Sequence, residues 1–139
     1  MNDVPFIKQE EPNECGVAAL TSIASYYLRR KVDYGEILRL CHILTGGLTI
    51  KELCKAASQI CIRALPIWCN IYDLEDNVPK PCIALWNKNH YIVITQMGDG
   101  MVRVVDPALG HLIYNRSDFV EKWYHDSEKG VAIAFEKTI

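Results

Sequence analysis

The feature that most constrains the fold of this 139-residue chain is a change in the spacing of its apolar residues near residue 62. Before this point they recur three or four residues apart, which predicts amphipathic helices over 15–29 and 33–41 and a third helix that starts with a capping box at Thr49 and Glu52. After it, strands are predicted at 63–68, 82–86, 91–96, 101–106, 111–115 and 131–136, with a short helix at 117–123. Helices followed by closely connected strands favour an α+β fold, in which N-terminal helices pack on a C-terminal antiparallel sheet.

We expect residues 1–139 to form a single domain, with a helical part of about 1–61 and a sheet part of about 62–139. A chain of this length buries roughly two thirds of the surface that its unfolded form exposes, so it needs no disulfide or metal ion to fold.

Charge and cysteine spacing exclude several classes of function. With 15 Lys and Arg against 17 Asp and Glu, the chain lacks the excess of positive charge that a nucleic-acid-binding face needs. The N-terminus lacks the basic start and the apolar stretch of a secretion signal, so we expect a reducing compartment and free thiols. No two of the six cysteines are separated by two residues, which argues against a metal or thiol-redox module and predicts neither a metal nor a cofactor.

Cys15 differs from the other cysteines in its position. It stands where an acid-rich segment meets the start of the first predicted helix, and Gly16 after it allows close approach of another backbone or a substrate. The N-terminus of a helix stabilises a thiolate, so Cys15 is a candidate nucleophile, although a helix-start cysteine can also be unreactive. The remaining cysteines are expected to be packing residues, namely Cys41, Cys54, Cys61, Cys69 and Cys82.

A nucleophilic cysteine needs an imidazole and a group that orients it, and His90 and Asp106 can supply such a pair. They flank two predicted strands that are joined by a turn at 98–100. A three-residue turn makes His90 the diagonal neighbour of Asp106 on the same face, with β-carbons about 7 to 8 Å apart. A two-residue turn places them on opposite faces. Gly100 at the last turn position favours the three-residue form.

Each member of this pair also has a simpler interpretation. An Asp before a Pro at a strand end is often only a turn former, and a His at the mouth of a strand is often only a hydrogen-bonded polar residue. His111, on a neighbouring predicted strand, is a weaker candidate for the base.

The chain resembles one known family through three motifs, which lie in order along nearly its whole length: Gln9-x5-Cys15-Gly16, Trp86-x3-His90-Tyr91-x-Val93 and Val105-Asp106-Pro107-Ala108-x-Gly110. It is similar to the papain-like leader peptidases that process bacteriocin precursors and form the N-terminal cytosolic domain of peptidase-containing ABC transporters. One departure is Glu14, where the family usually has Asp.

The resemblance implies a papain-like cysteine peptidase fold and a role for each motif residue. Cys15 is the implied nucleophile, His90 the general base and then acid, and Asp106 the group that orients His90. Gln9 is implied to donate its side-chain amide to the oxyanion beside the backbone N–H of Cys15, a role that suits an uncharged donor. Five aromatic residues are candidates to line the substrate channel: Trp68, Trp86, Tyr91, Trp123 and Tyr124.

Such enzymes remove the leader from a precursor peptide after a double-glycine-type motif, and the attached transporter exports the product with ATP. The implied partners are therefore the precursor peptide and the transmembrane and nucleotide-binding domains of the same transporter, at the cytoplasmic side of the bacterial membrane. We expect an excised domain of such a transporter, because the family continues towards membrane helices where this sequence ends. The alternative is a catalytically silent domain that only binds secretion substrates, and the retention of Cys15, His90, Asp106 and Gln9 counts against it.

Overall fold

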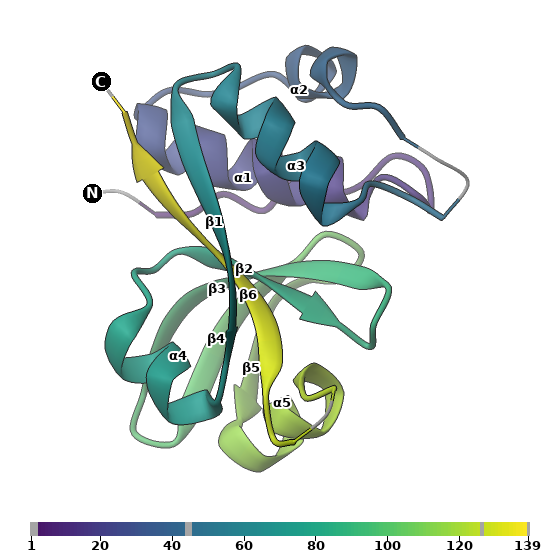
Figure 1. Ribbon diagram of the computed structural model, residues 1–139. Coiled ribbons are helices and arrows are strands. Elements are labelled where there is room, and N and C mark those ends of the chain that lie inside the picture. Colours follow the sequence, from purple (N-terminus) through teal and green to yellow (C-terminus); the bar gives the residue numbers. More distant parts are fainter. Residues whose placement is uncertain (1–2, 44–45, 126, 139) are drawn as a thin grey trace.

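The strands of the second half form one antiparallel sheet in the order β1-β6-β2-β3-β4-β5 (Figure 1). The computed structural model describes residues 3–43, 46–125 and 127–138. The strands are β1 (Ile62–Cys69), β2 (Cys82–Trp86), β3 (His90–Gly98), β4 (Met101–Asp106), β5 (Gly110–Asn115) and β6 (Gly130–Lys137). Helices packed with an antiparallel sheet confirm the predicted α+β class.

The helices are α1 (Cys15–Leu28), α2 (Tyr34–Leu40), α3 (Ile50–Ser58), α4 (Ile71–Asn77) and α5 (Arg116–Trp123). Four of them begin at a polar side chain that accepts a hydrogen bond from the backbone N–H three residues later, and these N-caps are Asp33, Thr49, Asn70 and Asn115. Such caps satisfy N–H groups that the first turn leaves without a partner, and they explain where these helices start.

Helix α1 is buried over most of its length. Every residue from Cys15 to Ala24 is buried, so the helix contacts protein on all sides. In Figure 1, α1, α2 and α3 gather at one end of the molecule, whereas α4 and α5 lie at the other. Cys15, at the N-terminus of α1, belongs to the apolar cluster that these three helices share with the sheet.

Both faces of the central strands are covered. Ile83, Tyr91 and Val93 belong to the apolar cluster of α1 and α3, while their neighbours Ala84 and Ile92 belong to a second cluster that contains α4 and α5. This alternation follows from the two-residue period of a strand. In the second cluster the predicted packing of two aromatic residues of α5, Phe119 and Trp123, is confirmed by ring centroids 5.7 Å apart.

The hairpin between β3 and β4 differs from the predicted one. Gly98 pairs with Met101, so the turn has two residues, Asp99 and Gly100, both with positive φ. That turn alone would put His90 and Asp106 on opposite faces. The register shifts by one residue at a bulge between Ile94 and Gln96, after which Val93 pairs with Val105. The predicted three-residue turn is wrong, and the bulge restores the predicted register at the far end of the hairpin.

Helix α4 is absent from the sequence prediction. It has only seven residues, too few for a helical period to show, and tertiary contacts stabilise it: Ile71 and Leu74 are buried. At its C-terminal end, the ammonium group of Lys80 donates to the backbone carbonyls of Leu74, Glu75 and Val78.

Candidate active site

Cys15 is the first residue of α1 and lines a cleft of about 370 Å³. The residue is only 6% exposed, and the cleft walls include Leu48 and Tyr91. The Tyr91 hydroxyl donates to the Leu48 carbonyl at 2.8 Å, which ties β3 to the segment before α3. A β-carbon on Gly16 would lie 3.1 Å from Leu48 and 3.2 Å from Tyr91, so glycine here permits the close approach that was predicted.

His90 and Asp106 form the predicted pair. His90 Nε2 lies 2.8 Å from Asp106 Oδ1, and the same oxygen accepts a 2.8 Å hydrogen bond from the backbone N–H of Ala108. The Asp106 side chain is 4% exposed. Burial raises the pKa of this carboxyl, but the hydrogen bonds from His90 and Ala108 outweigh it and hold the pKa below its usual value.

The environment of His90 favours the imidazolium form. Burial alone would lower the pKa of His90, but hydrogen bonding and charge from Asp106 and Cys15 raise it to about 9. Because Nε2 faces Asp106, Nδ1 is the nitrogen left for Cys15. The structure thus brings together Cys15, His90 and Asp106, which lie far apart in the sequence.

Gln9 lies beside the turn that follows Asp106. Its backbone N–H donates to the Pro107 carbonyl at 3.0 Å. Its side-chain Nε2 donates to the carbonyls of Glu11 and Pro12 at 3.3 and 3.4 Å, and its Oε1 is buried with no hydrogen-bond partner among the residues that the structure describes. A buried acceptor without a donor costs about 1 to 3 kcal/mol, so this carboxamide is held at a cost to stability.

Sequence reasoning missed the contact that holds the segment between Gln9 and Cys15. The hydroxyl of Tyr34, the first residue of α2, donates to Glu14 Oε1 at 2.6 Å and accepts from the backbone N–H of Glu10 at 3.1 Å. No motif connects Tyr34 with these residues, because the contact depends on how α2 packs against α1. The departure from the family at Glu14 is therefore part of a specific contact.

Of the five aromatic residues predicted as channel candidates, Tyr91 is the one that lines the cleft, within the part of the chain that the structure describes. Trp86 and Trp123 are buried in the apolar cluster of α4 and α5. The other two lie elsewhere: Trp68 is 47% exposed on β1, and the Tyr124 hydroxyl accepts from the backbone N–H of Ile71.

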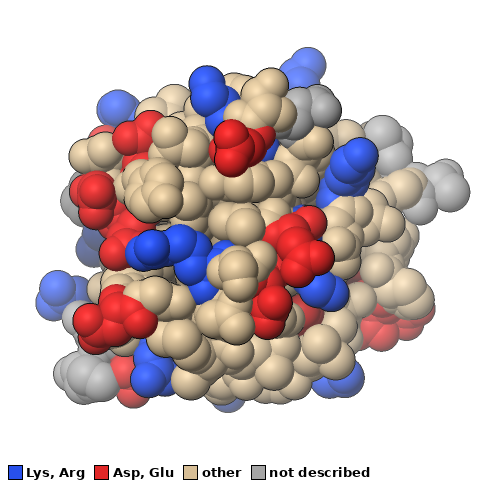
Figure 2. Space-filling view, turned by 90° about the horizontal axis from the view of Figure 1, so that it is seen from below, with Lys and Arg blue, Asp and Glu red and all other residues tan. Residues whose placement is uncertain are grey.

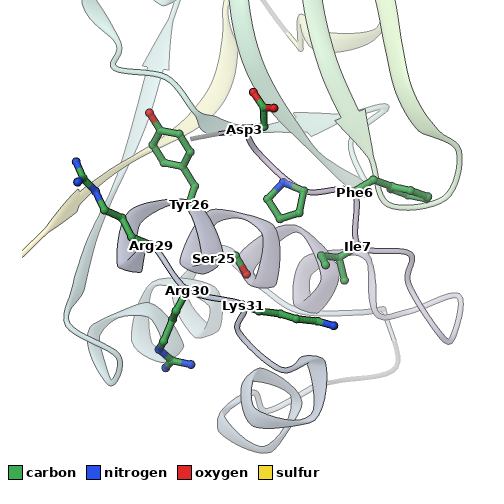
Figure 3. Close-up of a pocket in the computed structure, with 9 residues that line it drawn as sticks. Asp3, Phe6, Ile7, Ser25, Tyr26, Arg29, Arg30 and Lys31 are labelled. Atoms are coloured by element: carbon green, nitrogen blue, oxygen red, sulfur yellow. The ribbon is translucent and has the colours of Figure 1, made fainter. Parts of the chain in front are cut away.

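A cavity larger than the cleft at Cys15 lies elsewhere in the described part of the chain. It measures about 670 Å³ and lies between the N-terminal segment and the C-terminal end of α1, where it is lined by residues that include Ile7, Tyr26 and Lys31 (Figure 3). Arg30, which also lines it, forms a 3.1 Å ion pair with Glu36. The smaller cleft is lined by Cys15, which lies beside the imidazole of His90 and the carboxylate of Asp106, so chemistry and not volume identifies the candidate site.

The other cysteines lie in environments unlike that of Cys15. Burial raises the pKa of Cys41, Cys54, Cys69 and Cys82, and all four pack in or against the two apolar clusters as predicted. Cys61 instead lies in the turn between α3 and β1, where its φ is +62°. Among residues 3–43, 46–125 and 127–138, no group of three or more His, Cys, Asp or Glu side chains is arranged to hold a metal ion.

Charged residues are mixed on the face seen in Figure 2, where acidic and basic side chains alternate over the surface. Such a face carries no extended field of one sign. In the described part of the chain, no helix is both long enough and apolar enough to span a membrane.

Comparison with known proteins points to one family. The model of the Peptidase C39 family matches residues 3–138. The lacticin-481/lactococcin-DR transport/processing ATP-binding protein of Lactococcus lactis subsp. lactis is 42% identical over 122 residues, which cover 85% of this chain and 18% of that protein. This chain spans about a fifth of the length of the curated transporters that it matches.

Solved structures show the same fold. A double glycine motif protease from an AMS/PCAT transporter, in complex with the leader peptide, matches with a TM-score of 0.87 and 26% identity over 99% of this chain and 94% of that one. The peptidase domain of Streptococcus ComA, a bi-functional ABC transporter, matches with a TM-score of 0.84 and 20% identity over 97% and 99% of the two chains. The predicted papain-like peptidase fold is confirmed by these likenesses.

Proposed function

Because the chain belongs to the Peptidase C39 family, we propose that it is a cysteine endopeptidase that removes the leader from precursor peptides after a double-glycine-type motif. The observation that carries the proposal is the partly buried His90–Asp106 pair next to Cys15 at the N-terminus of α1. The related protease structure with a bound leader peptide and the processing proteins among the relatives support the substrate class.

In the proposed mechanism, the Cys15 thiolate attacks the scissile carbonyl carbon, and the carbonyl electron pair moves to its oxygen. The tetrahedral intermediate then collapses, the C–N bond breaks, and the His90 imidazolium gives its proton to the leaving amine. Water attacks the resulting thioester while neutral His90 takes a proton from it, and the C–S bond breaks to restore the thiolate and imidazolium. The raised pKa of His90, about 9, supports an imidazolium at neutral pH that can give its proton to the leaving amine.

Asp106 acts in this mechanism through His90 and does not touch the substrate. Its Oδ1 accepts from Nε2, which turns Nδ1 towards Cys15 and stabilises the positive charge on the ring. The hydrogen bond from the backbone N–H of Ala108 to the same oxygen fixes the orientation of the carboxylate.

Gln9 can serve as an oxyanion donor without losing its present contacts. Its Nε2 carries two hydrogens, and the long distances to the carbonyls of Glu11 and Pro12 suit a single hydrogen shared between the two oxygens. The second hydrogen is then free for the oxyanion, beside the backbone N–H of Cys15. Loss of one such donor typically costs about 10²- to 10³-fold in rate.

The cleft itself supports a substrate with small residues before the cut. Leu48 and Tyr91 approach α1 closely at Gly16, where an added β-carbon would lie 3.1 and 3.2 Å from them, and the cleft measures about 370 Å³. Small residues such as glycine pass this close approach without displacing Leu48 or Tyr91.

The relatives include transport/processing ATP-binding proteins, and their names support a context of peptide export for this activity. We propose that residues 1–139 act as one peptidase domain, supported by the family match over 3–138, at the cytoplasmic face of a bacterial membrane. Its partners are the precursor peptide and the transmembrane and nucleotide-binding domains of the same transporter. The peptidase step uses only the chain's own residues, and ATP is used by the transporter.

The proposal is tested by incubation with synthetic precursors that carry a double-glycine leader end, followed by mass mapping of the products. The wild-type chain is expected to cut once, directly after the double glycine, and Cys15→Ala to bind the precursor without cutting it. Cleavage by Cys15→Ala at the wild-type rate refutes the mechanism. Binding without cleavage by the wild type supports the alternative of a catalytically silent, substrate-binding domain.

A further inference from the structure

The Tyr34 hydroxyl forms hydrogen bonds with both ends of the 10–14 turn, which precedes Cys15 in the sequence. It accepts from the backbone N–H of Glu10 at 3.1 Å and donates to Glu14 Oε1 at 2.6 Å. Within the turn, the backbone N–H of Glu14 donates to the Glu11 carbonyl at 3.0 Å. Tyr34 is partly buried on α2, so a rigid helix and not a flexible loop holds this turn.

The same turn supports the carboxamide of Gln9. The two carbonyls that accept from Gln9 Nε2 belong to Glu11 and Pro12, between the two points that Tyr34 holds. The backbone of Gln9 is anchored separately, through Pro107. A movement of the turn therefore shifts the amide group of Gln9 while its backbone stays in place.

Resting on the function proposed above, we propose that Tyr34 is a positioning residue for the oxyanion donor: it holds the 10–14 turn so that the Gln9 amide points at the oxyanion. It acts through Gln9, and the Cys15–His90 pair does not depend on it. Burial and the hydrogen bond to Glu14 raise the pKa of Tyr34, so its hydroxyl keeps the proton that it donates to the carboxylate.

Two measurements separate this role from a merely structural one. Alkylation of Cys15 by iodoacetamide needs the thiolate but forms no oxyanion, so it reports on the Cys15–His90 pair alone. Peptide cleavage needs the oxyanion donor as well. A variant that displaces the Gln9 amide therefore loses cleavage and keeps alkylation, whereas a variant that loosens the whole fold loses both.

The test is Tyr34→Phe, which removes the hydroxyl and keeps the ring. We expect kcat to fall about tenfold, with KM and the alkylation rate at pH 6 within about twofold of the wild type. The matched control is Tyr27→Phe, because the Tyr27 hydroxyl donates to the Pro81 carbonyl at 3.2 Å and, within the described residues, makes no hydrogen bond to the 10–14 turn. This control also loses a hydrogen bond of a tyrosine hydroxyl and is expected to keep the wild-type kcat.

A double-mutant cycle with Gln9→Ala tests whether Tyr34 acts through Gln9. In the Gln9→Ala background, Tyr34→Phe is expected to lower kcat by less than about twofold further, because the group that it positions is gone. A second tenfold loss in that background overturns the inference. So does a wild-type kcat in Tyr34→Phe, or a parallel loss of alkylation and cleavage.

The two proposals fail differently. Cleavage by Cys15→Ala, or no cleavage by the wild type, rejects the proposed peptidase and the role of Tyr34 with it. Normal wild-type activity that is lost in Cys15→Ala and unchanged in Tyr34→Phe rejects the role of Tyr34 alone.

Discussion

Replacement of Asp106 by Asn separates the charge of this group from its geometry. Oδ1 of Asp106 accepts from both His90 Nε2 and the backbone N–H of Ala108, each at 2.8 Å. Both N–H donors need an oxygen as acceptor, so in Asp106→Asn the side-chain amide is held with its oxygen at the position of Asp106 Oδ1. Asp106→Asn therefore keeps the orientation of His90 and removes the negative charge beside it.

The expected effect is a shift of the basic limb of the pH profile. The pKa of His90 rises from 6.5 to about 9 against the effect of burial, and Asp106 is the first of the groups that raise it. Without this charge we expect the pKa to fall by at least about one unit, a loss of about 1.4 kcal/mol in stabilisation of the imidazolium. At pH 8 the imidazolium fraction then falls from roughly nine tenths to half or less, while at pH 6 it hardly changes.

The assay is kcat/KM for leader cleavage as a function of pH, which reports the ionisations of the free enzyme. The wild type is expected to lose activity with an apparent pKa near 9, and Asp106→Asn at a lower pH. The control, Asp106→Ala, also loses the orienting bond and is expected to be slow at every pH. If the basic limbs of the wild type and Asp106→Asn coincide, the charge of Asp106 does not set the ionisation of His90 and this reasoning fails.

Three further outcomes are expected from the structure. The pKa of His90 is raised in the folded state, so the imidazolium contributes to stability fully below about pH 6.5, and this contribution is lost as the pH rises through about 9. Urea unfolding should therefore show the stability of the wild type falling towards that of His90→Ala over this range. Gly130→Ala should destabilise the fold by about 3 kcal/mol or more in urea unfolding, since its β-carbon would overlap the Trp123 ring; near-wild-type stability would contradict the packing of α5 against β6. Gly16→Ala should cost about 1 to 3 kcal/mol and raise KM, because its β-carbon would lie 3.1 Å from Leu48 and narrow the cleft, and an unchanged KM would show that the substrate does not enter there.

Local rules were sufficient for much of the fold. The helix starts at Tyr34 and Ile50 follow from the caps Asp33 and Thr49, and the strands follow from alternating apolar residues. The bulge between Ile94 and Gln96 could not be predicted, because residues 91–94 are buried on both faces of the sheet and show no alternation of apolar and polar residues in which the extra residue would appear as a change of phase. The pairing of His90 with Asp106 was thus predicted from a turn that does not exist.

The candidate site likewise contains residues that could be predicted from the sequence and one that could not. The resemblance to the family assigned roles to Gln9 and Cys15, and their places in the chain indicated a helix start and an acid-rich turn before it. Tyr34 could not be found in this way, since its contact with Glu14 depends on the packing of α2 beside α1 and has no short-range signal. Long-range contacts of this kind are decided by tertiary structure and not by local propensity.

The link between the first residues and the turn after Asp106 also determines when the site can exist during synthesis. The Lys8 ammonium reaches the Ala108 carbonyl across 100 positions of sequence, and Gln9 is anchored to Pro107 beside it. A ribosome makes about 5 to 20 residues per second, so Cys15 is made several seconds before His90, Asp106 and the Pro107 anchor of Gln9. If these residues act as proposed, a nascent chain that already carries Cys15 cannot yet cleave a peptide, and the site cannot form before the turn after Asp106 has been made.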